Sequence, residues 1–578
     1  RFDAVIVGAG GSGMRASLQL AEAGLNVAVL SKVFPTRSHT VAAQGGIGAS
    51  LGNMSEDNWY WHMFDTVKGS DYLGDQDAIE FMCREAPGEA MHLEHIGVTF
   101  HRNDRGELDL RAFGGASKKR TAYVADITGQ AILHVLYEQL MRHHEAVDRY
   151  EEWFCTSLVL DGHGRCGGAI ARDIRTGAME IFDAKSVILA NGGNGQCYKP
   201  TTNALICTGD GIAQAYRVGC PIMDMEMVQY HPTTLVENGF LITEGARGEG
   251  AHLLNSEGRR FMEDYAPNKM ELASRDVVSR AEQTEINEGR GVGPDGQGIY
   301  LDITVVPRKR VLEALREIVN IGRDFAGTDI TREPIVIRPG QHYIMGGVRT
   351  DVHGRTPVEG LYAAGEVACV SVHGGNRLGA NSLLDTLIFG RRLGEHAARR
   401  ARELAMPAAP ASRLREDAAA IDAILARPRS GRRVSEIKDE LGRTMNEHVA
   451  VYRTDEGLTQ ALEVVGRLQE QAEQAYVDDR GTVFNQDVLG ALELGYMLDC
   501  AQATIVSALE RTESRGAQFR LDHPERDDDA WLKHINVTRG ADGAVAVAGS
   551  ERVDIAATPV ANIVDTTGAG DLFAAGFL

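Results

Sequence analysis

The chain opens with a short apolar run that leads directly into glycines. Residues 4–7 are apolar (AVIV), residues 8–13 are GAGGSG, and helical spacing follows to about Gly24. A strand that enters a glycine-rich turn and then a helix is typical of the first unit of a doubly wound sheet. Further apolar strands are expected over residues 26–30 and 187–190, the latter again opening onto glycines. The pattern therefore predicts an α/β fold built around a nucleotide-binding turn.

Toward the carboxyl end of the chain, the spacing of apolar residues becomes that of a helix. From about Leu414, apolar residues recur every three or four positions, which places them on one face of a helix. The clearest stripe consists of Leu458, Leu462, Val465 and Leu468, then Leu494, Met497, Leu498 and Ala501. Pro407 and Pro410 mark a linker ahead of it. We therefore expect a bundle-like helical domain, with the stripe forming its core.

The amino-acid composition and net charge limit which classes of molecule the protein is expected to bind. The 578 residues include 43% hydrophobic residues and 65 glycines, typical of a globular, loop-rich enzyme, and the formal net charge is -21. Nucleic-acid binding is disfavoured because phosphate backbones demand clustered Lys and Arg. An anionic substrate would need a local cationic pocket to offset the overall field.

Cysteine usage and hydropathy restrict the chemistry further. The eight cysteines are scattered without a CxxC pair, so no metal or iron-sulfur site is expected in this chain, and a reduced compartment is favoured. No run approaches the roughly 18 apolar residues of a membrane span. Since Arg1 stands almost on the first strand, we also expect no secretory leader. Attachment to a membrane would then depend on other subunits.

The glycine turn carries the sequence GxGxxG between a strand and a helix. Glycines at 8–13 allow a tight turn and let a pyrophosphate lie on backbone N–H groups at the helix start. The acidic ribose ligand of the general dinucleotide fingerprint is missing after the second strand, where Ser31 and Lys32 stand instead. Residues 36–46 (TRSHTVAAQGG) follow, and their glycine pair can bring bare backbone against a flat ring.

These motifs together resemble the flavoprotein subunits of succinate dehydrogenase and fumarate reductase, from Phe2 to about His534. The family has the same Ser-Lys pair after its second strand. The resemblance implies FAD as the cofactor, attached covalently through His39, a bond that changes the electronics of the flavin. The related L-aspartate oxidases lack a histidine at this position, so Ser38-His39-Thr40 favours the dicarboxylate dehydrogenases.

The resemblance also implies which residues hold the FAD. They come from the glycine turn, the second strand, the histidine loop and three later segments. They are Gly8, Ala9, Gly10, Gly11, Ser12, Gly13, Ser31, Lys32, Arg37, Ser38, His39, Thr40, Gln44, Gly45, Gly46, Asp210, Glu366, Ser382 and Leu383.

Polar residues in glycine-rich loops between 227 and 385 have the composition expected where a small polar ligand is bound. By resemblance the substrate carboxylates would be held by His231, Thr243, His342 and Arg377. A guanidinium fork suits a carboxylate better than an ammonium does.

Proton transfer is assigned by the same resemblance. Arg275 would exchange the proton with the substrate, and Glu244 and Arg247 would relay protons to it. An arginine base is costly, because deprotonating a group with a reference pKa near 12.5 at neutral pH requires roughly 7 kcal/mol. Desolvation and the like charge of Arg247 would reduce that cost.

The expected architecture is a Rossmann-like FAD-binding domain with an inserted α+β capping domain and a C-terminal helical domain. The FAD-binding domain is expected over residues 1–226 and 343–403, the cap over 227–342 and the helical domain over 412–534. The expected reaction is oxidation of succinate to fumarate, or the reverse. Electrons would leave through an iron-sulfur subunit, and anchor subunits would hold the complex on the cytoplasmic face of the inner membrane.

Residues 535–578 resemble part of a ribokinase-like sugar kinase, with the motif DTTGAGD at 565–571. In such kinases the Gly-Ala-Gly amides form an anion hole and the aspartate is the base. The segment is too short to hold a sugar site, so we expect a fragment without kinase activity. Fumarate reduction, L-aspartate oxidation, sugar phosphorylation and a non-catalytic flavin-binding subunit remain alternatives at this point.

Overall fold

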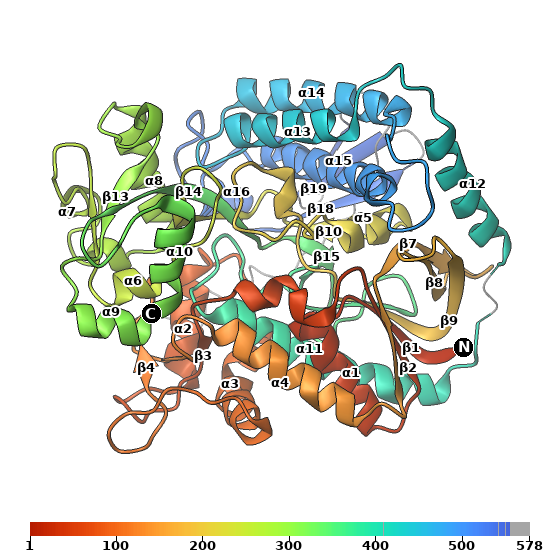
Figure 1. The fold of residues 1–578 in the computed structure, drawn as a ribbon, viewed down its shortest axis with the longest axis horizontal. Helices are drawn as coiled ribbons and strands as arrows, with labels where there is room; N and C mark the ends of the chain where they lie inside the picture. The colour runs from red at the N-terminus through yellow and green to blue at the C-terminus, as the bar shows by residue number, and fades with distance from the viewer. Residues whose placement is uncertain (408–409, 541–542, 549–550, 555–578) are drawn as a thin grey trace.

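The computed structural model describes residues 1–407, 410–540, 543–548 and 551–554 (Figure 1). Its amino-terminal part is built on a seven-stranded sheet in the order β6-β2-β1-β9-β8-β7, with β16 also pairing with β9. The strands are β1 (Phe2–Val7), β2 (Val27–Ser31), β6 (Val147–Glu151), β7 (Trp153–Leu160), β8 (Cys166–Asp173), β9 (Met179–Leu189) and β16 (Leu361–Ala363). β1 runs parallel to both β2 and β9. The predicted α/β fold is confirmed, and the three strands expected from the apolar runs are neighbours in it.

Helices cover this sheet and hold the glycine turn against it. α1 packs against α11 and α4, and the three lie together in the lower part of Figure 1. These helices are α1 (Gly11–Glu22), α4 (Thr128–Arg142) and α11 (Asn381–Glu403). A Cβ at Gly13 would stand 1.9 Å from the carbonyl oxygen of Gly8, and a Cβ at Gly8 would stand 2.2 Å from that of Ala190. The turn therefore requires glycine, because no side chain fits where helix and strands approach.

The predicted cap contains a four-stranded antiparallel sheet in the order β11-β14-β13-β12, drawn with its helices at the left of Figure 1. Its main elements are β11 (Val228–Leu235), α6 (Gly245–Gly248), β12 (His252–Leu254), α8 (Arg275–Asn287), β13 (Ile299–Asp302), α9 (Arg308–Ala314), α10 (Arg316–Ala326) and β14 (Ile335–Ile344). β11 pairs with β14 so that Gln229 lies opposite Tyr343, and His231 lies opposite Gly340. This register brings two segments about a hundred residues apart in sequence to one edge of the sheet.

The carboxyl-terminal helices form the layer at the top of Figure 1. They are α12 (Ser412–Ala426), α13 (Val434–His448), α14 (Asp455–Gln474) and α15 (Gln486–Glu510). The predicted stripe is buried almost throughout, and only Leu462 is partly exposed while still packing on the core. Within the described ranges, every helix is too short or too polar to span a bilayer.

Strand β18 (Ile535–Gly540) joins a sheet that belongs to the rest of the chain. It pairs with β10 (Ile222–Met223), with Ile222 opposite Val537, and then with β19 (Gly543–Ala548). Ile535 and Val537 are fully buried. This pairing gives no support to a separate sugar-kinase fragment beginning at residue 535. The kinase-like motif at 565–571 lies outside the described residues.

Candidate active site

One cavity lies between the glycine turn, the cap and the start of α11, and it brings together most of the predicted site residues. The predicted cofactor residues that line it are Gly10, Gly11, Ser12, Ser38, His39, Thr40, Gln44, Gly45, Gly46, Glu366, Ser382 and Leu383. The predicted substrate and proton-transfer residues that line it are His231, Thr243, Glu244, Arg275, His342 and Arg377.

The remaining predicted cofactor residues fall into two groups. A second cavity shares Gly10 and Ser38 with the first, and the others that line it are Gly8, Ala9, Ser31, Lys32 and Asp210. Gly13 lies behind the turn in the close contact described above, and Arg37 is exposed, outside both cavities. Together the two cavities, which share several lining residues, extend from the second strand and the glycine turn to the cap, as an extended dinucleotide requires.

The cavity walls carry hydrogen-bonding atoms that have no partner. Within the described part of the chain, Ser12 Oγ, Gln44 Oε1 and Asn191 Oδ1 are buried without a hydrogen bond, and all three residues line the first cavity. Buried polar atoms without partners are rare in folded proteins, and each such atom calls for an explanation. Hydroxyl and amide groups around a glycine turn match the phosphates, ribitol and ring edge of FAD, so the residues present fit this cofactor.

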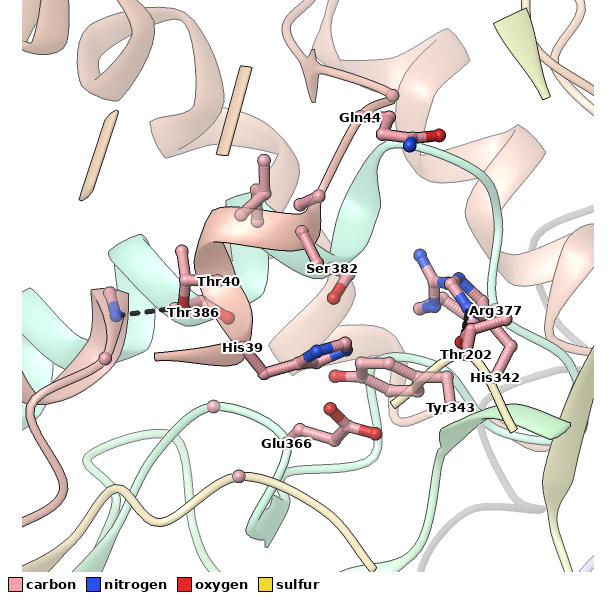
Figure 2. A pocket seen from close by; sticks show the side chains of 18 of the residues that line it. His39, Thr40, Gln44, Thr202, His342, Tyr343, Glu366, Arg377, Ser382 and Thr386 are labelled. Atoms are coloured by element: carbon pink, nitrogen blue, oxygen red, sulfur yellow. Dashed lines mark hydrogen bonds between the residues drawn. The ribbon is translucent and has the colours of Figure 1, made fainter. Parts of the chain in front are cut away.

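His39 begins the 3-10 helix η2 (His39–Ala42) and points into the cavity between Ser382 and Glu366 (Figure 2). Its Nδ1 accepts a hydrogen bond from the backbone N–H of Ala204 at 3.3 Å. Burial lowers the pKa of His39 to about 4, so the ring is neutral at physiological pH. The structure thus presents an uncharged imidazole to the cavity, with its Nδ1 lone pair already engaged.

Lys32 links the sheet to two helices at the second cavity. Its Nζ lies 2.7 Å from Asp210 Oδ2, 2.8 Å from Glu493 Oε1 and 2.9 Å from Thr208 Oγ1. Burial works to lower the pKa of Lys32, but the two carboxylates raise it overall. Lys32 is therefore a fixed cation that anchors Asp210 at the start of α5 (Asp210–Arg217).

Two arginines meet at one glutamine in the substrate end of the cavity. Gln229 Oε1 accepts hydrogen bonds from Arg275 Nη1 at 2.9 Å and from Arg377 Nη2 at 3.0 Å. Burial lowers the pKa of Arg377 to about 9, and the charge of Arg275 acts in the same direction. Gln229 is neutral and Glu244 pairs with Arg275, so in the described structure Arg377 has no carboxylate within ion-pair distance and this end of the cavity has an excess of positive charge.

Two histidines lie beside these arginines. The ring centroids of His231 and His342 are 4.9 Å apart. His231 Nδ1 accepts from the backbone N–H of Thr233 at 3.2 Å, and His342 Nδ1 lies 2.7 Å from Thr202 Oγ1. Burial, followed by the charge of Arg275, holds the pKa of each histidine well below its usual value. Both rings are therefore neutral hydrogen-bonding groups rather than extra cations.

Glu244 connects the two arginines of the proposed proton path. Its Oε2 lies 2.7 Å from Arg275 Nε and 3.9 Å from Arg247 Nη2, and its Oε1 accepts from the backbone N–H of Gly114 at 2.5 Å. Burial works to raise the pKa of Glu244, but Arg275 and Arg247 lower it overall. Arg247 lies behind Glu244, fully buried and outside the cavity lining, and burial lowers its pKa. The three side chains thus form a continuous buried array that leads away from the cavity.

Sequence reasoning missed three polar residues that line or support the site. Gln229 could have been found, because it lies two positions before His231 and side chains two apart share one face of a strand. Tyr343 lines the cavity next to His342, with the guanidinium of Arg377 4.4 Å from its ring centroid. No local sequence pattern marked Thr202, because the β-bridge between Thr201 and Gln341 is what brings this segment to the site.

The eight cysteines are all buried and free of disulfides. Among the described residues, no group of three or more His, Cys, Asp or Glu side chains is arranged to hold a metal ion. The array of arginines, histidines and one carboxylate is therefore the chemically distinctive part of this cavity.

Comparison with known proteins places the chain among flavoproteins. A family described as FAD binding domain matches residues 3–383, and one described as Fumarate reductase flavoprotein C-term matches residues 438–562. The second match continues past residue 534, into the segment that resembled a sugar kinase.

Individual relatives match over nearly the whole chain. The succinate dehydrogenase flavoprotein subunit of Rickettsia bellii is 46% identical over 558 residues, covering 92% of each chain. The fumarate reductase flavoprotein subunit of Mycobacterium tuberculosis is 43% identical over 561 residues, covering 94% of this chain and 96% of the relative. The solved structure of an E. coli quinol fumarate reductase variant superposes with a TM-score of 0.90 at 37% identity, covering 97% of this chain and 98% of that one.

Proposed function

Because the chain belongs to the flavoprotein subunits of succinate dehydrogenase and fumarate reductase, a family of FAD-dependent oxidoreductases, we propose that it interconverts succinate and fumarate. Succinate oxidation is the primary assignment, since the succinate dehydrogenase subunit of Rickettsia bellii is among its most similar relatives. Fumarate reduction is the alternative, supported by the match to an E. coli quinol fumarate reductase. One site serves both directions, because the two acids differ only by a pair of hydrogens.

The observation that carries this proposal is the convergence of Arg275 and Arg377 on one neutral glutamine oxygen. The two buried cations share the one carboxylate of Glu244, which contacts only Arg275 of the pair, so they suit an anionic ligand. Guanidinium groups bind carboxylates in a planar fork. His231 and His342 add neutral hydrogen-bonding groups beside them. A four-carbon diacid would supply the missing counter-charge and be held at its two ends.

FAD would supply the hydride acceptor when bound. The residues of this chain would orient the diacid, exclude water beneath the cap and move the proton. Arg275 would exchange that proton with the substrate carbon, and Glu244 would conduct it because its Oε2 already contacts Arg275 Nε at 2.7 Å. In the reducing direction Arg275 would give the proton to the substrate carbon. Fixed geometry beneath a closed cap is the main source of the expected rate.

We also propose that the flavin is bound covalently to His39. A histidine alkylated at Nε2 keeps a lone pair on Nδ1, and Nδ1 is the atom that accepts from Ala204 N–H. Burial keeps the ring neutral. While Nδ1 accepts from Ala204 the ring proton is on Nε2, and this proton would leave as Nε2 forms its bond to the flavin. In protein precipitated with acid, yellow colour should remain in the wild-type pellet and be lost to the supernatant in His39→Ala.

The partners are proposed from the names of the relatives, which are subunits of larger complexes. An iron-sulfur subunit would take the electrons, and membrane-anchor subunits would hold the complex on the cytoplasmic face of the inner membrane. Co-purification of the chain from solubilised membranes, with iron and acid-labile sulfide in the same fraction, would test this arrangement.

The direct test is succinate-dependent reduction of an artificial electron acceptor by the purified flavoprotein. We expect activity in the wild type, competitive inhibition by malonate and loss of turnover in Arg275→Ala with the flavin still bound. Unchanged succinate oxidation in Arg275→Ala would contradict the proton-transfer assignment. Hydrogen peroxide release with L-aspartate, but not with succinate, would instead identify an aspartate oxidase.

A further inference from the structure

Three polar side chains form a hydrogen-bonded relay outside the site described above. They belong to Ser371, His534 and Asp224. His534 Nδ1 lies 2.7 Å from Asp224 Oδ2, and His534 Nε2 lies 3.4 Å from Ser371 Oγ. A histidine with a carboxylate on one ring nitrogen and a serine hydroxyl on the other is the arrangement that activates serine as a nucleophile. The longer of the two contacts is within the range seen at such sites when no ligand is bound.

One sheet brings these three residues together from distant parts of the chain. Ser371 follows β17 (Ala368–Cys369) by two positions, Asp224 directly follows β10, and His534 directly precedes β18. All three strands belong to one six-stranded sheet. Asp224 Oδ1 also accepts from the backbone N–H of Ile535 at 3.1 Å. The carboxylate is thus fixed by two contacts, and it holds the ring of His534 in one orientation.

A third cavity adjoins this relay. Its volume is about 930 Å³, within the roughly 300–1,000 Å³ typical of small-molecule sites. Ser371 and His534 both line it, and Val358 and Leu404 add apolar surface. Asp224 lies outside this lining, and its side chain is 2% exposed. The relay therefore has its carboxylate buried behind the histidine and its serine at the cavity wall.

The backbone of Ser371 is held in an unusual conformation beside a helix start. Its φ is 60°, in the left-handed region that residues other than glycine seldom adopt. Its backbone oxygen accepts from the N–H of Asp75 at 2.7 Å, which ties it to the start of α3 (Gln76–Ile96). Backbone strain of this kind collects at active sites, and the nucleophile of α/β-hydrolases stands on a strained turn. Residues 74–77 line the same cavity, where the positive end of the helix dipole would stabilise an oxyanion.

We propose that Ser371 and His534 form a second catalytic site, positioned by Asp224, which hydrolyses small carboxylic esters bound in the third cavity. This activity goes beyond the proposed interconversion of succinate and fumarate, which uses the first cavity. Neither reaction needs the other, so each can be measured separately on the same protein.

The reaction has two steps. In the first, Ser371 Oγ forms a bond to the ester carbonyl carbon while its proton passes to His534 Nε2. The bond from that carbon to the alcohol oxygen then breaks, and the alcohol leaves with the proton. In the second step a water molecule gives a proton to His534 and attacks the acyl carbon. The acid is released, and the proton returns to Ser371 Oγ.

The charges around His534 determine when it can act as the base. Burial works to lower the pKa of His534, but Asp224 raises it overall. Asp75 acts in the same direction as Asp224, and Arg511 opposes them. Only the neutral ring can take a proton from serine, so the reaction should become faster as the pH rises through the pKa of His534.

The test uses the purified full chain with its flavin bound, at mildly alkaline pH. A fluorophosphonate probe labels activated serines, because Oγ displaces fluoride from phosphorus as the base takes the hydroxyl proton. We expect mass spectrometry to find the label on Ser371, and hydrolysis of 4-nitrophenyl acetate to stop once the label is in place. Ser371→Ala should abolish both, whereas succinate oxidation and the unfolding temperature stay at their wild-type values.

Variants of the two other residues separate catalysis from structure. His534→Gln should slow the labelling roughly 10²–10⁴-fold, the range for a general base. Asp224→Asn keeps the size of the side chain, and asparagine tolerates the φ of 52° at this position. It should slow the labelling and shift its pH midpoint downward, since the carboxylate no longer raises the pKa of His534. Asp224→Glu should restore part of the rate and of the midpoint.

Ser70→Ala is the matched control. Ser70 is also buried, but its Oγ donates to the backbone oxygen of Val67 at 2.8 Å and belongs to no such relay. Its replacement should leave the labelling of Ser371 unchanged. A folded wild type that takes no label, in a mixture where a known serine hydrolase is labelled, would overturn the proposal. Labelling that proceeds equally fast in His534→Gln would also overturn it, because the histidine would then have no part in the reaction.

Discussion

Two groups of buried arginines in this protein differ in how completely they are paired. Arg511 and Arg515 lie between the helical domain and the rest of the chain, with Glu226 and Glu513 beside them, and all four side chains are 0% exposed. Every guanidinium nitrogen of these two arginines has an acceptor. At the cavity, by contrast, Arg377 Nε and two nitrogens of Arg247 have no acceptor in the described structure.

The difference also appears in the direction of the pKa shifts. Burial works to lower the pKa of Arg511, but Glu226, Asp224 and Glu513 raise it overall. At the cavity, burial and the charge of Arg275 lower the pKa of Arg377 to about 9, because the opposing effects of Tyr343, Glu366 and Glu244 are too small to offset them. A buried cation that the protein has fully paired stabilises a contact between segments. One that lines the cavity and is left partly unpaired, as Arg377 is, is available to a ligand. Incomplete pairing alone is not sufficient, because Arg453 is also buried with one nitrogen unpaired and lines neither cavity.

The same substitution placed in both regions tests this distinction, and the largest effect is expected at the cavity. Arg275→Lys keeps the positive charge next to Glu244 but loses the planar group that meets the substrate. We expect turnover to fall 10²–10⁴-fold, the range for loss of a proton-transfer group, with little change in the unfolding temperature. Steady-state kinetics and thermal unfolding on one preparation measure both. A wild-type turnover would remove Arg275 from the mechanism.

For Arg511→Lys we expect the opposite pattern, in which stability falls and turnover stays the same. Arg511 donates to Glu226, Glu513 and the backbone oxygens of Trp531 and Lys533, and an ammonium cannot satisfy all four. Each buried acceptor left unsatisfied costs about 1–3 kcal/mol, so we expect a loss of roughly that size in the free energy of unfolding. Turnover per folded molecule should be unchanged. Denaturant titration measures the first quantity, and a fall in turnover without a loss of stability would contradict the structural role.

Arg377→Lys is expected to act on binding. A charged hydrogen bond contributes about 1.5–3 kcal/mol, which corresponds to roughly 10- to 150-fold in affinity. The dissociation constant of a non-reacting diacid such as malonate should rise by that factor, while the unfolding temperature changes little. Calorimetric titration provides the measurement. Equal affinity in the two proteins would show that Arg377 does not contact the carboxylates.

The smallest expected effect is a dependence of malonate affinity on pH. The positive charge of Arg377 attracts the diacid, and this charge is lost as the pH rises through the pKa of about 9. Affinity for malonate should therefore be constant near neutral pH and should weaken above pH 9 by at most about tenfold per pH unit. In Arg511→Lys the same break should appear, since the cavity is unaltered. Affinity that stays level to pH 11 would show that Arg377 keeps its proton in the free protein.

Much of the fold could be predicted, because its signals are local. The run at residues 4–7 and the glycines that follow determine a strand and a turn with no information from elsewhere in the chain. The site was predicted through the family resemblance, which assigned His39, Arg275 and Arg377 residue by residue. Their roles remain predictions, although the structure brings all three to one cavity. Arg37, also predicted as a cofactor ligand, is exposed and lines neither cavity, and its role likewise remains a prediction.

The sequence by itself determined the sheet with its glycine turn, the helical stripe and the chemical types available to the site. These depend on periodicity and on the conformations that glycine allows, which act over a few residues. Only the tertiary structure decided which of the buried charges are paired. Gln229 lies between Arg275 and Arg377 because strands and helices far apart in sequence pack together. Ionisation depends on burial and on neighbours within a few ångströms, and no local pattern encodes these.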